Sequence, residues 1–143
     1  MKRVLITAGA NGIGLAMAQG FVADGAQVWV TDVDRAAIAA LPPSIRGTQL
    51  DAADETGLAT LMARIKSDWG GLDVLCANAG IKGPTALIED VALADWRACL
   101  AVNLDGAFLA AKHVAPLMKA QESGVMTFTS STAGLFGYPN RSP

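Results

Sequence analysis

The feature that most constrains this chain is a regular alternation of short apolar runs with helical patterns. Apolar residues recur at the one-face spacing of a helix between the runs, most clearly from Leu58 to Trp69. This alternation predicts an α/β fold in which helices connect parallel strands, with no internal linker or repeat. The expected strands lie at residues 3–7, 26–31, 46–50, 72–77 and 123–130.

Helix boundaries are marked by capping residues and by helix breakers. Asp34 and Asp54 precede helical patterns and can cap them, while Pro42 and Gly70 follow such patterns and end them. The expected helices run from Ile13 to Gly25, from Asp34 to Pro42, from Asp54 to Gly70, and from about Ala94 to Ala120.

The composition excludes two classes of partner. Apolar residues make up 52% of the chain, yet the richest run, at residues 99–118, is interrupted by Asn103, Asp105 and Lys112 and is unsuited to a membrane. The net charge is −2, without a basic stripe, so nucleic acid is not an expected partner. The apolar run after Arg3 is too short for a signal peptide and continues into a glycine turn.

The two cysteines predict neither a disulfide nor a metal site. Cys76 and Cys99 are far apart in the sequence and both lie in apolar surroundings. We interpret them as reduced core thiols of a cytoplasmic protein, and we expect no metal.

A glycine-rich turn, TAGANGIG at residues 7–14, joins the first strand to the first helix. Its glycines, Gly9, Gly12 and Gly14, allow a tight turn and let a phosphate approach the backbone. The N–H groups of the helix that follows would attract that phosphate. The alternative is a turn that merely contains glycines, but its position between strand and helix favours nucleotide binding.

Asp32 stands at the carboxyl end of the second strand, where a carboxylate can accept hydrogen bonds from ribose hydroxyls and repel a 2′-phosphate. This placement predicts NAD as the cofactor rather than NADP. The alternative role is a cap for the next helix, for which Asp34 is better placed. Arg35 argues in the other direction, because a nearby arginine can accommodate a 2′-phosphate.

Five motifs in register resemble those of the short-chain dehydrogenases/reductases. They are TAGANGIG at 7–14, DAAD at 51–54, ANAG at 77–80, VNLDGAF at 102–108 and SSTAG at 130–134. The resemblance implies a Rossmann-type, doubly wound, three-layer αβα fold with strand order 3-2-1-4-5. It also implies an oxidoreductase that transfers a hydride between NAD(H) and a secondary alcohol or ketone.

The resemblance also assigns cofactor-binding residues. The pyrophosphate would lie against Asn11, Gly12, Ile13 and Gly14. Asp51 would bind the adenine amino group, with the Ala52 backbone beside it. Asn78, Ala79 and Gly80 would line the ribose and brace the central strand. The first family glycine is replaced by Ala8, and the first asparagine of the usual NNAG motif by Ala77.

Two further residues take catalytic roles by resemblance: Asn103 would interrupt the long helix and hold a water in a proton relay, and Ser131 would bind the substrate oxygen. Each assignment has a structural alternative. Asn103 could be a polar kink in a helix, Ser131 an ordinary serine at a strand end, and Asp51 a turn cap. His113 is expected to be solvated.

The family's general-base tyrosine would follow directly after Pro143, with its lysine beyond. We therefore interpret residues 1–143 as one dinucleotide-binding domain that is incomplete at its carboxyl end. Tyr138 does not have the spacing of that base and is expected in the wall of the substrate pocket. The complete enzyme is expected to be a homodimer or homotetramer acting on a polyol, sugar, hydroxy acid or 3-oxoacyl thioester. The alternatives are a non-catalytic nucleotide-binding module and a relative of the nucleotide-sugar epimerases.

Overall fold

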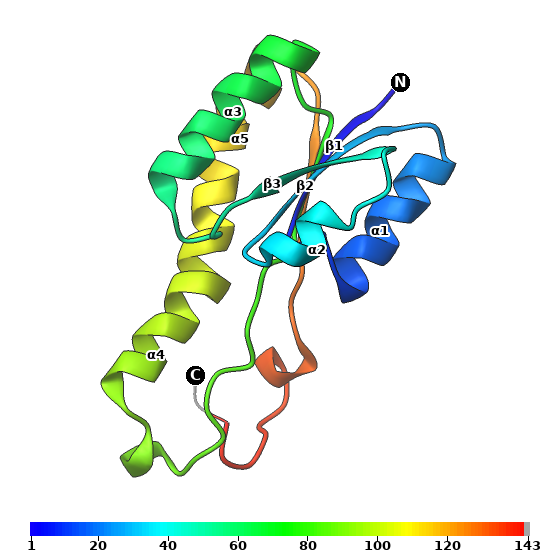
Figure 1. The fold of residues 1–143 in the computed structure, drawn as a ribbon. Helices are drawn as coiled ribbons and strands as arrows, with labels where there is room; N and C mark the ends of the chain where they lie inside the picture. The colour runs from blue at the N-terminus through cyan, green and yellow to red at the C-terminus, as the bar shows by residue number, and fades with distance from the viewer. Residues whose placement is uncertain (142–143) are drawn as a thin grey trace.

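The computed structural model describes residues 1–141 and arranges them in three layers, with a sheet between two sets of helices (Figure 1). The last two residues of the expected domain, Ser142 and Pro143, lie outside the described residues. The strands are β1 (Arg3–Thr7), β2 (Gln27–Asp32), β3 (Ile45–Gln49), β4 (Val74–Ala77) and β5 (Val125–Phe128). The helices are α1 (Gly12–Ala23), α2 (Arg35–Ala39), α3 (Glu55–Trp69), α4 (Leu93–Leu100) and α5 (Gly106–Gln121). A π-helical turn at Ala101–Asp105 joins α4 to α5, and short 3₁₀ turns lie at Ile88–Asp90 and Thr132–Gly134.

The sheet has the order β3-β2-β1-β4-β5, and every neighbouring pair is parallel. Leu5 of the central strand β1 pairs with Trp29 of β2 on one side and with Leu75 of β4 on the other. The predicted fold class and strand order are therefore confirmed. The order changes direction between β1 and β4, which is the place where ligands bind in folds of this type.

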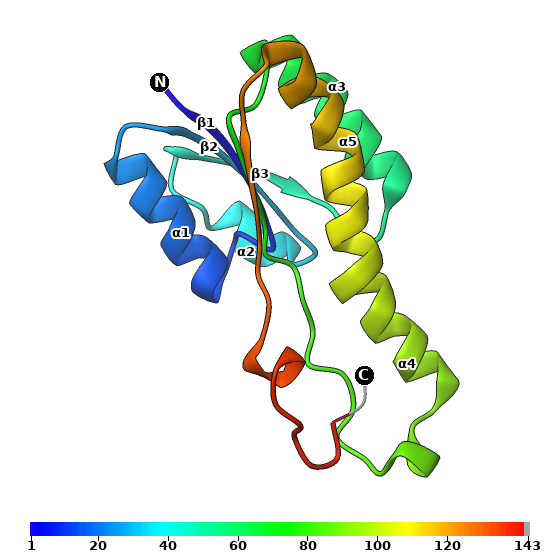
Figure 2. The same cartoon turned by 180° about the vertical axis from the view of Figure 1, so that it is seen from behind.

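Each face of the sheet has its own apolar core, because alternate side chains of a strand point to opposite faces. Val4 and Ile6 belong to the core under α1 and α2, whereas Leu5 lies between them in sequence and packs under α3 and α5. Figures 1 and 2 show the two pairs of helices on opposite sides of the sheet. The alternation explains why the strands are continuous apolar runs, as expected of a sheet that is covered on both faces.

Most of the predicted helix ends are confirmed. The Asp34 carboxylate accepts hydrogen bonds from the backbone N–H groups of Ala36 and Ala37, at 2.9 and 3.0 Å. Asp54 accepts one from Gly57 at 3.0 Å, and Gly70 ends α3 with φ of +76°. The long helical stretch expected from residue 94 to 120 is observed from 93 to 121, with the π turn inside it.

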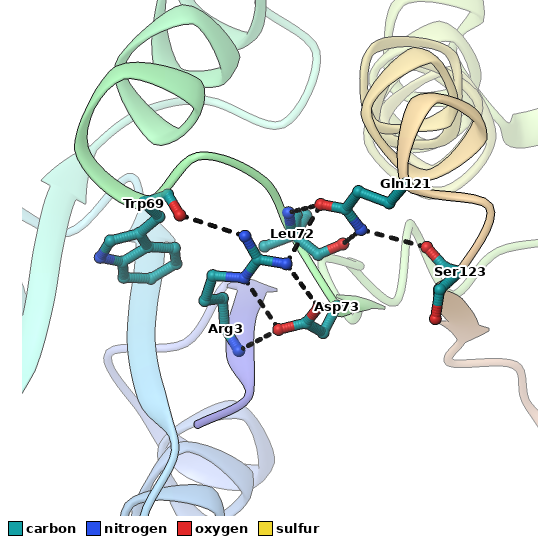
Figure 3. Close-up of polar contacts among 6 residues, drawn as sticks. All are labelled: Arg3, Trp69, Leu72, Asp73, Gln121 and Ser123. Atoms are coloured by element: carbon teal, nitrogen blue, oxygen red, sulfur yellow. Dashed lines mark hydrogen bonds and ion pairs between the residues drawn. The ribbon is translucent and has the colours of Figure 1, made fainter.

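A polar cluster closes the amino ends of β1 and β4 (Figure 3). The Arg3 guanidinium donates to both carboxylate oxygens of Asp73, at 2.9 and 2.6 Å, and to the carbonyl oxygen of Trp69 at 3.1 Å. Gln121, at the end of α5, accepts from Arg3 and bonds both backbone groups of Leu72. The hydrogen bonds from Arg3 lower the pKa of Asp73, although partial burial opposes this shift.

His113 does not have the environment expected from the sequence. Its side chain is only 21% exposed and its Nε2 lies 3.4 Å from an oxygen of Glu55, at the start of α3. The same carboxylate is paired with Lys112 at 2.6 Å, and this contact lowers the pKa of Glu55. The prediction of a solvated histidine is wrong because α5 packs against α3 at this point.

The two cysteines agree with their prediction, since both are free and buried. Strand β5 lies at the sheet edge and remains largely open, with Val125 57% and Phe128 51% exposed. Within residues 1–141, no helix combines the length and the apolar character that crossing a bilayer requires.

Candidate functional site

The carboxyl ends of β1, β4 and β5 are joined by a small hydrogen-bond network. The Thr7 hydroxyl oxygen accepts from the backbone N–H groups of Asn78 and Ala79, at 2.9 and 3.0 Å. The Asn78 amide donates to the carbonyl oxygens of Thr7 and Ala8, both at 3.2 Å, and its oxygen accepts from Thr129. Asn78 therefore braces the central strands, which is one half of the role assigned to it; its contact with a cofactor stays a prediction.

The glycine turn between β1 and α1 uses its three glycines for different reasons. A Cβ on Gly9 would lie 2.6 Å from the Val30 side chain, and one on Gly14 would overlap the Ala8 carbonyl oxygen. Gly12 has φ of +51°, and no protein atom lies within 4 Å of the place where its Cβ would be. Gly9 and Gly14 are thus required by packing, while Gly12 leaves open space above the turn.

The amino end of α1 has no side-chain cap. Asn11 occupies the N-cap position with extended backbone angles, but its side chain bonds none of the first N–H groups of the helix. This end differs from those of α2 and α3, which aspartates cap. Free N–H groups and the positive end of the helix dipole attract an anion, and Asn11, Ile13 and Gly14 line a hollow of about 580 Å³ at this point.

Asp32 is buried at the end of β2, with 9% of its surface exposed. One carboxylate oxygen accepts from the N–H of Ala10 in the glycine turn and the other from the N–H of Asp34, both at 3.1 Å. The cap of α2 is Asp34, so the alternative role for Asp32 is not observed. A carboxylate has about four acceptor positions, so Asp32 keeps capacity for further donors.

Asp32 shares a hollow of about 400 Å³ with Asp51 and Ala52. The Asp51 carboxylate accepts from the N–H of Ala53 at 2.9 Å, which is the turn-capping alternative for this residue. Ala52 is 8% exposed and packs beside Gly106 of α5. Capping therefore accounts for one oxygen of Asp51, and a role toward adenine stays a prediction.

Asn103 lies in the π turn and clamps the segment after β4. Its side-chain oxygen accepts from the Ile81 N–H at 2.7 Å, and its nitrogen donates to the Ile81 carbonyl oxygen at 2.8 Å. The side chain is thus more than a polar kink, because it fixes the backbone that follows Gly80. Sequence reasoning missed this clamp, although an asparagine in an apolar helical run was a signal that its amide has a partner.

Ser131 follows β5 and is exposed, and its hydroxyl oxygen accepts from the N–H of Ala133 at 3.1 Å. This bond is that of a serine capping the short 3₁₀ turn that follows. Ser131 and Asn103 line both the hollow at the glycine turn and a second one of about 390 Å³, which Tyr138 also lines. The Tyr138 hydroxyl lies 2.9 Å from that of Thr132.

The hollows adjoin one another along the carboxyl edge of the sheet. Ala8, Ala79 and Gly80 line both the hollow with Asp32 and the hollow at the glycine turn. Ile81, Asn103 and Ser131 line both the latter and the hollow with Tyr138. A groove therefore leads from Asp32 over the glycine turn to Ser131. Its walls, within residues 1–141, include no group of three or more side chains suited to a metal ion.

The sequence model described as short chain dehydrogenase matches residues 2–143. The chain belongs to the short-chain dehydrogenase family. Cis-4-hydroxycyclohexanecarboxylate dehydrogenase of Sinomonas cyclohexanicum is 37% identical over 96% of the chain. The match covers 58% of the length of that relative, so the present chain spans a little over half of it.

Two solved structures have a closely similar fold. NAD⁺-bound xylitol dehydrogenase matches 98% of the chain and 56% of its own length, with a TM-score of 0.93 and 30% identity. ElxO with NADP bound matches 98% of the chain and 59% of its own length, with a TM-score of 0.89 and 28% identity. Both kinds of nicotinamide cofactor thus occur among the similar structures.

Proposed function

We propose that this chain forms the cofactor-binding part of a dehydrogenase that transfers a hydride between NAD(H) and a secondary alcohol or ketone. The observation that carries the proposal is the groove between Asp32 and Ser131. One end offers an acceptor for ribose hydroxyls, the middle offers an uncapped helix end, and the other end offers hydroxyl groups. This order matches the parts of an adenine dinucleotide followed by a substrate.

The residues of the chain fit this cofactor. The free N–H groups of α1 suit the negative charge of a pyrophosphate. The open space above Gly12, which has no Cβ, lets the pyrophosphate approach the backbone. Asp51 and Ala52 would lie at the adenine, with Ala79 and Gly80 along the ribose. The bound nicotinamide supplies the hydride acceptor or donor.

The Ser131 hydroxyl would donate to the substrate oxygen as negative charge develops on it. Asn103 would act indirectly, because its amide already bonds both backbone groups of Ile81 and thereby holds one wall of the site. A proton relay through water at Asn103 stays a prediction. So do assembly into a homodimer or homotetramer and a cytoplasmic location.

NAD is proposed over NADP because Asp32 would lie close to a 2′-phosphate. Two like charges about 4 Å apart repel by ~4 kcal/mol at an effective dielectric constant of 20. Titration of the protein with NADH and NADPH, followed by calorimetry, should give at least about tenfold tighter binding of NADH. Asp32→Ala and Asp32→Asn should both narrow this ratio by about tenfold.

Asp34→Ala is the matched control, since it removes a carboxylate two residues away whose oxygen caps α2. The Asp34→Ala variant should prefer NADH over NADPH by the same ratio as the unmodified protein. An unchanged ratio in both Asp32 variants would reject the role of Asp32. Absence of measurable binding of either dinucleotide to folded protein would reject the proposed function.

A further inference from the structure

The hollow beside Ser131 has a cationic wall. It measures about 390 Å³, within the size range of small-molecule sites, and its lining includes Lys82, Arg141 and Tyr138 together with Ser131 and Asn103. Neither Lys82 nor Arg141 belongs to a motif that assigned the cofactor site. Both lie at the end of the groove beyond the glycine turn, where the proposed function places the substrate.

Two segments that are distant in sequence bring these cations to one wall. Lys82 follows β4, and Arg141 lies in the loop after β5. One guanidinium nitrogen of Arg141 donates to the Lys82 carbonyl oxygen at 3.3 Å. A second contact joins the same segments, from the Ala86 N–H to the Asn140 carbonyl oxygen at 3.0 Å. The Arg141 guanidinium is therefore held beside the Lys82 backbone, and both residues line the same hollow.

The charge of this wall contrasts with that of the chain. The sequence has 13 acidic and 11 basic residues, yet among the described residues no aspartate or glutamate lines the hollow. Asp95 lines an adjoining hollow with Lys82, but within residues 1–141 neither Lys82 nor Arg141 forms an ion pair. Their charges are thus available to a ligand.

We propose that Lys82 and Arg141 bind a carboxylate group of the substrate, so that the substrate class is a hydroxy acid or the corresponding oxo acid. This inference rests on the proposed function, which places the reacting oxygen at Ser131. Arginine presents a planar fork of donors that matches a carboxylate, and lysine adds a point charge. A neutral polyol would leave both cations without a partner on this wall.

The test measures binding rather than turnover. With NADH bound, hydroxy acids can form a complex that cannot react, and its dissociation constant can be measured by calorimetry. The probes are 3-hydroxybutyrate and 4-hydroxypentanoate, which differ in the spacing between hydroxyl and carboxylate, and the uncharged amide of each. At least one acid should bind about tenfold or more tightly than its amide, and added salt should narrow this difference.

Substituting Lys82 or Arg141 tests whether these two residues bind the carboxylate. Lys82→Gln and Arg141→Gln should each weaken binding of that acid by about 10- to 100-fold and leave the binding of its amide within about twofold. Lys119→Gln removes one positive charge from the far end of α5 and should change neither the affinity for the acid nor that for its amide. All variants should bind NADH like the unmodified protein, because neither cation lines the hollows at the glycine turn or at Asp32.

The outcomes distinguish the two proposals. Equal affinities of acid and amide in the presence of bound NADH would overturn the carboxylate site and leave the proposed function intact. A parallel loss of acid and amide binding in the Lys82 and Arg141 variants would overturn it as well, since it would show a general effect on the pocket. Failure of NADH to bind would overturn the proposed function and this inference with it.

Discussion

The amino and carboxyl ends of the parallel sheet use their polar groups in opposite ways. At the amino end, Arg3, Asp73 and Gln121 satisfy one another and the nearby backbone (Figure 3). At the carboxyl end, Asp32 and Ser131 bond only backbone N–H groups and face open hollows. Closure at one end stabilises the sheet, whereas the open end leaves donors and acceptors for a ligand.

The largest effect that this comparison predicts is on catalysis at the open end. In protein that oxidises a secondary alcohol, Ser131→Ala should lower kcat by about 10²–10⁴-fold, the usual range for a group that stabilises charge on a reacting oxygen. Steady-state rates measure this effect. Ser123→Ala, an exposed serine at the opposite edge of the sheet, is the control, with rates within about threefold of the unmodified protein. Near-full activity of the Ser131 variant would show that the serine only caps its turn.

The next effect concerns stability at the closed end. Asp73→Asn should lower the free energy of unfolding by about 1.5–3 kcal/mol, because it removes the charged partner of a half-buried guanidinium. Urea unfolding measures the change. Asp68→Asn breaks the more exposed ion pair with Arg46, whose side chains are 36% and 44% exposed, and should cost less than about 1 kcal/mol. Equal losses of unfolding free energy in Asp73→Asn and Asp68→Asn would show that the cluster around Arg3 stabilises the fold no more than an exposed ion pair does.

The closed end should also give the protein an acid-sensitive contribution to stability. Arg3 holds the pKa of Asp73 below its ordinary value of 3.8, so the folded state favours the ionised carboxylate. The contribution is complete above that value and is lost as the pH falls from it toward the lower pKa of the folded state. The stability difference between the unmodified protein and Asp73→Asn should therefore be constant from pH 7 to about pH 5 and shrink below about pH 4. A constant difference down to pH 3 would refute this linkage.

The smallest effect concerns strain at the open end. Ala8 has φ of +50°, a conformation that costs a residue with a Cβ about 1–2 kcal/mol. Ala8→Gly should remove this cost and lose about 0.5–1 kcal/mol through the greater freedom of glycine in the unfolded chain, for a net gain of about 0.5–1 kcal/mol. Thermal unfolding would measure the gain. Ala10→Gly, two residues further on and without positive φ, should instead destabilise the protein.

The parts that sequence predicted well depend on local patterns or on motifs. The strand order follows from alternating elements and the family resemblance, and the caps at Asp34 and Asp54 follow from residue type and position. The resemblance implied that the long helix is interrupted at Asn103, and the interruption is observed; its form, a π turn over Ala101–Asp105, was not predicted, because its residues continue the helical spacing on both sides. Asn103 was singled out by its motif, but its partner Ile81 was not.

Contacts between distant segments were beyond sequence reasoning. Arg3 and Asp73 are 70 residues apart, and Arg141 and Lys82 are 59 apart, so no spacing rule connects them. His113 was misplaced for the same reason, since only the packing of α5 on α3 brings Glu55 to it. Each of these pairs is set by the tertiary fold, whereas capping and turn chemistry operate within a few residues.

The π turn between α4 and α5 divides one continuous rod into two segments with independent orientation. An added residue in a helical turn rotates everything beyond it by about 100°, so the two segments need not present the same stripe of side chains in one direction. α5 can keep Val114 and Met118 against the sheet while Asn103 is aimed at Ile81. Deleting a single residue from Ala101–Asp105 would remove this rotational offset, so that Asn103 and the core residues of α5 could not all keep their present contacts.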